Sequence, residues 1–239
     1  MRVAIIQSCY LPWRGYFDFI DDVDLFVVYD DVQYSRGSWR NRNRIKTANG
    51  SHWLTVPVRH APRGQLIHDI RIDDGQPWRA HHARALQLAY ARAPHFATYR
   101  DPLLARLTQP FATISELNLT LLEWVMAELA IATPIRCSEE VAAQGRSTDR
   151  LIDVLRKVGA TSYVSGPTAD AYLEAEKFAA AGIGLEYKEY DYPEYPQLWG
   201  SFEPHVSVLD LLFNCGPDSR RWLKSRSPNR VVVPPRGRM

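Results

Sequence analysis

The stretch "VAIIQSCYLPWRGYFDFIDDVDLFVVYDD", residues 3 to 31, decides the fold of this chain of 239 residues. It opens with a short apolar run, "VAIIQ" (3–7), of the kind that forms a buried strand. A turn at Leu11 and Pro12 precedes a segment whose apolar residues recur at helical spacing, and "DLFVVYDD" (24–31) is a second buried strand. The order of strand, loop, helix and strand is typical of an α/β protein.

The second half of the chain continues this alternation of helices and strands. Its best-marked helix, 147–160, opens with Ser147 or Thr148 as the N-cap and closes at Gly159. Earlier in the chain, Pro57 restricts a further strand to a sheet edge. The sequence therefore predicts a Rossmann-like parallel sheet of about five strands. The other elements are predicted at 52–59, 77–94, 111–131, 161–166, 168–183, 184–190 and 206–216.

One α/β domain is predicted over residues 1–225, with a helical insertion at about 77–145 and a flexible tail at 226–239. Lys and Arg number 29 and Asp and Glu number 27, so the formal net charge is +2. A chain so balanced carries no field that predicts a nucleic-acid or membrane-surface partner. Any basic patch must therefore be local.

The cysteines and the hydropathy pattern predict where the protein resides. Cys9, Cys137 and Cys215 are odd in number and widely spaced, which argues against a disulfide framework and against a structural zinc site. The amino terminus lacks the apolar core of a signal peptide, and no apolar run is long enough to span a membrane. We therefore expect a cytoplasmic protein without a membrane span.

The loop after the first strand is the first candidate site. In parallel α/β sheets, ligands bind beyond the carboxyl ends of the strands, which places Gln7, Tyr10, Trp13 and Arg14 at the binding edge. Arg14 and the helix start would suit a phosphate, whereas Trp13 could equally be a packing residue. Cys9 in the same loop is either a nucleophile or a small buried residue.

This loop resembles that of nucleotidylyltransferase-like proteins. "PWRGY" (12–16) stands where those proteins carry P-H-x-G-H, after the same first strand and at the start of the same helix. The resemblance implies a Rossmann-like fold in which Gly15 permits close approach to the backbone. Both histidines of that motif are replaced here, so the imidazoles that would donate to a phosphate are missing.

The stretch "YDDVQYSRGSWRNRNRIK" (29–46) is the second candidate site. Asp30 and Asp31 follow the second strand, so they reach the same edge and could act as a base, bind a metal or merely cap the loop. The arginines that follow, among them Arg40 and Arg42, suit bidentate recognition of phosphate or carboxylate. A nucleic-acid arm would look similar locally, but the balanced charge disfavours it.

Two further positions are candidates. His81 and His82 are consecutive, so on a helix they point about 100° apart and only one can face a site. His81 is either a general base or an ordinary histidine, and no neighbouring residues complete a metal site. Ser165 ends a later strand at the shared edge, without the G-x-S-x-G pattern of a serine hydrolase.

The pattern QY-x4-WRNRN-x-I, here Gln33-Tyr34 and Trp39 to Ile45, together with "YVSG" and "SVLDLLFNCG", resembles the WbqC-like family over nearly the whole chain. That family is named for a member encoded among O-antigen synthesis genes. The resemblance implies a bacterial protein connected with surface polysaccharide or nucleotide-sugar biosynthesis. The substrate-binding residues expected from the residues and the resemblance are Gln7, Tyr10, Trp13, Arg14, Gln33, Tyr34, Trp39, Arg40, Asn41, Arg42, Asn43 and Ser165.

We hypothesise from these residues an enzyme that transfers an acyl or aminoacyl group to an amino sugar carried by a nucleotide. Arg14, Arg40 and Arg42 would bind the anionic carrier, and Asp31, beside Asp30, or His81 would act as the base. Acyl-coenzyme A or a nucleotide is the candidate cofactor, and no metal site is expected. One alternative is nucleotidyl or adenylate chemistry with Mg²⁺; another is a non-catalytic scaffold of polysaccharide assembly.

Overall fold

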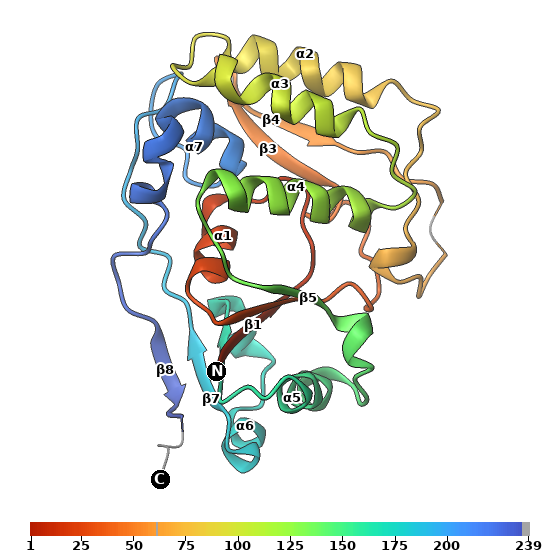
Figure 1. Cartoon of the computed structure of the whole chain (residues 1–239), viewed down its shortest axis with the longest axis vertical. Helices are drawn as coiled ribbons and strands as arrows, with labels where there is room; N and C mark the ends of the chain where they lie inside the picture. The colour runs from red at the N-terminus through yellow and green to blue at the C-terminus, as the bar shows by residue number, and fades with distance from the viewer. Residues whose placement is uncertain (61, 236–239) are drawn as a thin grey trace.

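The computed structural model describes residues 1–60 and 62–235 (Figure 1). The opening stretch folds as predicted, into strand β1 (Arg2–Ile6), helix α1 (Arg14–Asp21) and strand β2 (Leu25–Val28). The two strands pair in parallel from Val3 opposite Leu25 to Ile6 opposite Val28. This unit is the centre of the sheet.

The central sheet has six strands in the order β5-β2-β1-β6-β7-β8. The first five pair in parallel, and β8 pairs with β7 in the antiparallel direction. The predicted Rossmann-like α/β fold is therefore confirmed. The order reverses between β1 and β6, because the chain moves outward from β1 to β2 on one side and from β6 to β7 on the other. The remaining strands are β5 (Ile135–Cys137), β6 (Ser162–Ser165), β7 (Gly184–Tyr187) and β8 (Arg230–Val233).

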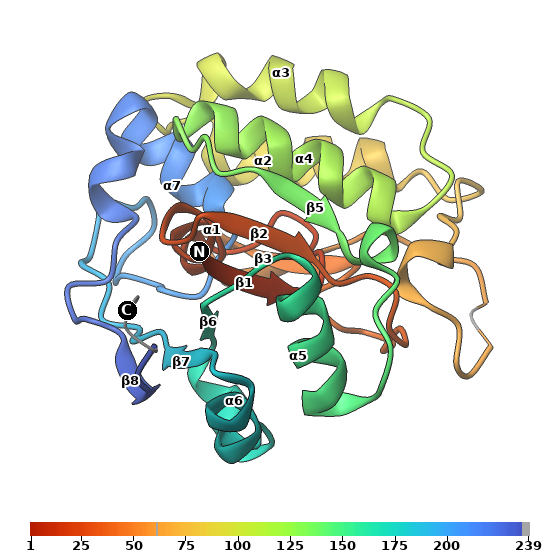
Figure 2. The ribbon, with the colours of Figure 1, turned by 60° about the horizontal axis from the view of Figure 1, so that its bottom comes forward.

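Helices cover both faces of this sheet, as Figure 2 shows, with α3 and α4 on one side of β1 and β2 and α5 and α6 on the other. Alternate residues of β1 serve the two sides: Ala4 packs in the core under α1 and α4, whereas Val3 and Ile5 pack in the core under α5 and α6. The helices are α2 (Trp78–Tyr90), α3 (Phe96–Leu107), α4 (Ile114–Glu128), α5 (Ser147–Lys157), α6 (Ala175–Ala181) and α7 (Val208–Cys215).

A two-stranded antiparallel hairpin stands apart from the central sheet. It consists of β3 (Arg42–Thr47) and β4 (Gly50–Thr55), with Arg44 opposite Trp53. No further strand was predicted in the arginine-rich stretch 29–46, but its last five residues belong to strand β3. Burial alternates from Arg42 to Ile45 along this strand, because Asn43 and Ile45 are buried whereas Arg42 and Arg44 are half-exposed.

Several predicted boundaries were wrong. The residues of α3 were not recognised as a helix, since Pro94 and Pro102 are typical helix breakers. Helix α5 has Arg146 at its N-cap position without a side-chain cap, so neither Ser147 nor Thr148 caps it. The single helix predicted at 168–183 is instead a 3-10 segment, Pro167–Ala171, followed by the separate helix α6.

The carboxyl-terminal segment also differs from its prediction. A flexible tail was expected from residue 226, but Arg230–Val233 forms strand β8 at the sheet edge. Residues 236–239 lie outside the described residues. Further 3-10 segments lie at Ile67–Asp69, Ser138–Val141 and Gly216–Trp222.

Candidate functional site

A cavity of about 520 Å³ lies beyond the carboxyl ends of β1 and β6, where the strand order reverses. This crevice is the place where open α/β sheets bind their ligands. Ile6 and Cys9 reach it from β1, Thr168 from the segment after β6, and Tyr190 from the segment after β7. We call it the switch-point cavity. The β3–β4 hairpin and the segment before it close one side.

Aromatic rings form one wall of the switch-point cavity. The indole of Trp13 lies edge-on to Tyr190, with ring centroids 5.1 Å apart, and the ring of His205 lies 5.6 Å from it. Gly15 makes this arrangement possible, because a Cβ there would come within 2.6 Å of an indole carbon. Gly15 was expected to admit a ligand to the backbone. The space beside it is instead filled by the indole of Trp13.

Arginines form the opposite wall. The Arg40 guanidinium donates to Oε1 of Gln7 and, at 3.0 Å, to Sγ of Cys9. The Arg44 guanidinium donates to the carbonyl of His205 at 3.2 Å and lies over the ring of Trp39 at 5.9 Å. The Nε atoms of Arg40 and Arg44 are buried without a hydrogen-bond partner. Both residues line the cavity, and planar guanidinium groups suit an anionic ligand.

Cys9 and Tyr16 lie at the base of this wall. Burial raises the pKa of the Cys9 thiol, although the neighbouring Arg40 guanidinium opposes that rise. Burial also raises the pKa of Tyr16, whose hydroxyl donates to the Gln7 carbonyl at 3.0 Å. Both groups therefore stay protonated at neutral pH. A protonated thiol is a poor nucleophile, which favours a packing role for Cys9.

The two aspartates after β2 have internal partners. Asp30 is only 1% exposed, and its carboxylate accepts the Ser8 N–H at 2.8 Å and the Ser115 hydroxyl. Asp31 accepts the Ser138 hydroxyl at 2.5 Å and forms an ion pair with Arg150. Neither aspartate lines the switch-point cavity. They fasten the loops around it, Asp30 to α4 and Asp31 to the start of α5.

Arg14 and Tyr10 face away from the cavity, contrary to the expected binding role. The buried Arg14 guanidinium donates to the carbonyls of Pro193 at 2.6 Å and of Trp222 at 3.0 Å, and burial lowers its pKa. Tyr10 is fully buried, and its hydroxyl lies 2.9 Å from Nδ1 of His82. Both residues therefore hold distant segments together.

The asparagines of the WRNRN motif support the site from behind. Asn43 lines the cavity and donates to the carbonyls of Tyr10 at 3.2 Å and Leu11 at 2.7 Å, which holds the loop after β1 against the hairpin. Asn41 is buried and donates to the Val56 carbonyl at 2.9 Å. Arg42 lies over the ring of Trp53 at 4.3 Å, at the back of the arginine wall.

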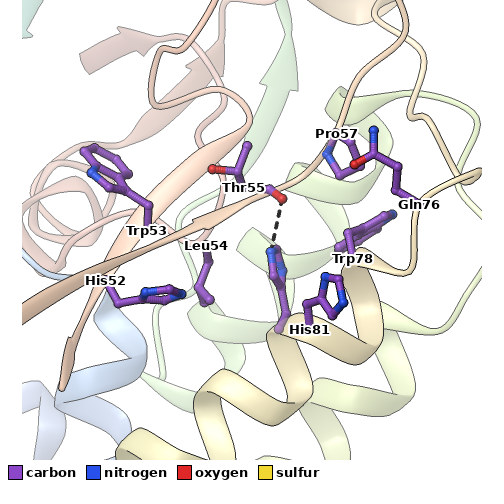
Figure 3. Close-up of a pocket in the computed structure, with 9 residues that line it drawn as sticks. His52, Trp53, Leu54, Thr55, Pro57, Gln76, Trp78 and His81 are labelled. Carbon is purple, nitrogen blue, oxygen red and sulfur yellow. Dashed lines mark hydrogen bonds between the residues drawn. The ribbon is translucent and has the colours of Figure 1, made fainter. Parts of the chain in front are cut away.

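The other predicted residues lie elsewhere. Gln33 is exposed and Tyr34 is buried, and neither lines the cavity. The Ser165 hydroxyl donates to the Tyr163 hydroxyl at 3.3 Å. His81 lines a second cavity between β4 and α2, drawn in Figure 3. Expected residues that do reach the switch-point cavity are Trp13, Trp39, Arg40 and Asn43, with Gln7 bound to Arg40.

Several lining residues were not among the expected substrate-binding residues, among them Arg44, Thr168, Tyr190 and His205. Thr168 and Tyr190 follow the carboxyl ends of β6 and β7, so the rule that identified the first loop could also have found them. Arg44 directly follows the WRNRN motif. Nothing in the local sequence marks His205, because it reaches the cavity only through the packing of the segment before α7.

The fold and the cavity define an α/β protein with a mainly parallel, Rossmann-like sheet and an arginine-lined site at its switch point. The model of the WbqC-like protein family matches residues 7–222, so the chain belongs to that family. A relative from Mycobacterium tuberculosis, "Uncharacterized protein Rv1507c", is 44% identical over 227 residues, covering 93% of this chain and 97% of the relative. No solved structure matches.

Two absences hold for the part of the chain that the structure describes. Within residues 1–60 and 62–235, no three His, Cys, Asp or Glu side chains gather into a group that could hold a metal ion. Over the same residues, none of the helices has both the length and the apolar character needed to cross a bilayer.

Proposed function

We propose that this protein is a group-transfer enzyme that binds a small anionic substrate, such as a nucleotide-linked amino sugar, in the switch-point cavity. The observation that carries the proposal is the pair of arginines, Arg40 and Arg44, that line the crevice of a parallel sheet. Planar guanidinium groups suit the oxygens of phosphates. The membership in the WbqC-like family supports a role in surface-polysaccharide biosynthesis, for which the family is named.

The aromatic wall supports a substrate that carries a ring as well as a charge. Trp39 is 44% exposed and lies beside the arginines, so a nucleobase could stack on it while the phosphates meet Arg40 and Arg44. The cavity of about 520 Å³ lies within the range of small-molecule sites, which is roughly 300–1,000 Å³. These features favour a nucleotide-linked substrate over a bare anion.

The proposed reaction is acyl transfer from an acyl-coenzyme A to the amine of the sugar. The amine nitrogen attacks the thioester carbonyl, a C–N bond forms, and the C–S bond breaks with its electron pair going to the coenzyme A sulfur. His205 is the one imidazole among the residues that line the switch-point cavity, so we assign it the role of general base, which accepts the proton of the amine. Asp30 and Asp31 are positioning residues here, and His81 takes no part.

The test combines binding and turnover. Uridine and thymidine diphosphates, and the same nucleotides linked to amino sugars, should raise the Tm of the pure protein, since a ligand bound only by the folded state stabilises it. Adding acetyl-coenzyme A should release free thiol, and His205→Gln should slow that release at least about 100-fold while leaving the Tm shift in place.

The outcomes separate the alternatives. Absence of a Tm shift with every nucleotide would refute the proposed site. A shift without thiol release, with each of several acyl donors, would instead identify a non-catalytic binding protein. Pyrophosphate release from a nucleoside triphosphate that requires Mg²⁺ would replace acyl transfer with nucleotidyl transfer.

A further inference from the structure

A second cavity, of about 310 Å³, lies between strand β4 and helix α2, on the far side of the hairpin from the switch-point cavity. We call it the hairpin cavity. Figure 3 shows His52 projecting from β4 toward the side on which α2 presents Trp78 and His81. Among the residues that line it there is no Asp, Glu, Lys or Arg. The switch-point cavity, in contrast, is walled by two arginines.

The side chains that line the hairpin cavity can both donate and accept hydrogen bonds. The imidazoles of His52 and His81 are exposed, and neither ring has a hydrogen-bond partner among the residues that the structure describes. An imidazole offers one donor and one acceptor when neutral, and the Gln76 amide offers two donors and a carbonyl oxygen. Such groups match a ligand that carries several hydroxyls.

The floor of the cavity is rigid and uncharged. Nε2 of His82 lies 3.2 Å from the Thr55 carbonyl, and its Nδ1 lies 2.9 Å from the Tyr10 hydroxyl. The hydrogen-bond network assigns the ring proton to Nε2, because a carbonyl can only accept. Burial, with the nearby imidazoles of His81 and His52, lowers the pKa of His82 to about 4, so this ring is neutral.

Strand β4 adds unpaired backbone groups at the same place. On β3, the Arg44 carbonyl accepts from Ser207 N–H and the Lys46 N–H donates to Tyr90, so these residues point away from β4. Because antiparallel pairs alternate, Trp53, which lies opposite Arg44, points its own N–H and carbonyl away from β3. These two groups therefore face the open edge of β4, beside the hairpin cavity.

We propose that the hairpin cavity binds one neutral sugar ring of a glycan. Each sugar hydroxyl both donates and accepts, as the imidazoles, the Gln76 amide and the free backbone groups of Trp53 require. The buried ring of Trp78 lies edge-on to His82 at 5.2 Å and closes the inner end of the cavity, so the sugar would be held by hydrogen bonds and not by stacking on this ring. A phosphorylated ligand would need a cationic side chain, and none lines this cavity.

The inference does not depend on the reaction proposed for the switch-point cavity. The probes are methyl glycosides of glucose, galactose, mannose, rhamnose and N-acetylglucosamine, none of which is charged. Saturation-transfer NMR on the full-length protein should detect binding of at least one of them. His81→Ala should weaken that binding at least about tenfold, since about 1.4 kcal/mol of lost hydrogen bonding is a factor of ten.

The matched control is His205→Ala, which removes an exposed imidazole from the other cavity. It should leave binding of the glycosides unchanged, and both variants should keep the Tm of the parent within a few degrees, because both side chains are exposed. Three results would overturn the inference: no glycoside binds at 50 mM, on the order of the weakest useful affinity; His81→Ala binds as well as the parent; or binding is lost in His205→Ala and kept in His81→Ala.

Discussion

The two cavities beside the β3–β4 hairpin are close neighbours with opposite chemistry. The switch-point cavity is walled by Arg40 and Arg44, whereas the hairpin cavity has no charged side chain in its lining. Trp53 joins them, because it lines the hairpin cavity while its ring lies 5.4 Å from that of Trp39 at the switch point. The hairpin thus furnishes walls for both cavities: His52–Thr55 of β4 line the hairpin cavity, and Asn43 and Arg44 of β3 line the switch-point cavity.

The partition between the cavities is held together by the loop after β1. Tyr10 donates its N–H to the Trp39 carbonyl at 2.9 Å, and its own carbonyl accepts from Asn43. Its hydroxyl contacts His82, the floor of the other cavity. A mutation on one side should therefore affect the other through Tyr10 or through the contact between Trp53 and Trp39.

The largest expected effect comes from removing the charged wall. Arg40→Ala with Arg44→Ala should weaken nucleoside diphosphate binding at least about 100-fold, because each charge-assisted hydrogen bond contributes about 1.5–3 kcal/mol. Calorimetry measures the affinity. Arg36→Ala, an exposed arginine of the same stretch that lines neither cavity, should change it less than about twofold. Equal losses in both variants would mean that only the local net charge matters.

The next effect concerns how much the hydrogen bonds of the buried Asp30 stabilise the fold. Asp30→Ala leaves the Ser8 N–H and the Ser115 hydroxyl without their acceptor, so the free energy of unfolding should fall by about 3 kcal/mol in urea titrations. The exposed Asp69→Ala is the control, with an expected change under about 0.5 kcal/mol. A stability equal to that of the parent would show that these two hydrogen bonds do not stabilise the fold.

The free energy of unfolding should depend on pH because of His82, which lies at the floor of the hairpin cavity. The pKa of His82 is about 4 in the folded protein and 6.5 for an unperturbed histidine, so the unfolded state binds its proton first as the pH falls. Stability is therefore complete above about pH 6.5 and declines toward pH 4. At pH 5 this loss should be about 2 kcal/mol relative to pH 7.5.

The variant His82→Gln isolates that contribution, since an amide can still donate to Thr55 and accept from Tyr10 but does not titrate. Urea unfolding of both proteins at pH 7.5 and pH 5 gives the comparison. The parent should lose about 2 kcal/mol more than the variant. Parallel pH profiles for the two proteins would show that His82 is not the group responsible.

The smallest effect concerns the aromatic wall. Gly15→Ala should lower the free energy of unfolding by about 1 kcal/mol and weaken nucleotide binding a few-fold, because the new methyl group displaces the indole of Trp13. Adding Trp13→Phe should recover part of the lost stability, which a double-mutant cycle in urea measures. If the double variant is no more stable than expected from the two single changes, the overlap with the indole is not the cause.

Much of the fold was predictable because its signals are local. The apolar runs of β1, β2, β6 and β7 and the left-handed Gly159 that ends α5 stand out in a few consecutive residues. Strand β5 was missed because its three residues carry too little pattern. Strand β8 was missed because its pairing depends on β7, which lies more than forty residues earlier in the sequence.

For the candidate site, the sequence predicted which loops lie together but not which of their side chains face the cavity. Residues after parallel strands meet at one edge, so the loops at 7–14 and 29–46 were expected to lie together, and residues of both line the switch-point cavity. Whether a side chain in those loops faces the crevice or the interior depends on distant partners. Asp30 bonds to Ser115, 85 residues away, and Arg14 donates to Pro193, 179 residues away.

The sequence by itself determined the alternation of strands and helices, the sheet edge at which the switch-point cavity lies, and the WRNRN motif of the WbqC-like family, because these depend on neighbouring residues and on spacing. Only the tertiary structure decided that Arg40 and Arg44 face the crevice while Asp30 and Arg14 are fastened inside. It also decided that His81 belongs to a second, uncharged cavity. Side chains with the same chemistry acquire different roles because burial and hydrogen-bond partners are set by segments far apart in the chain.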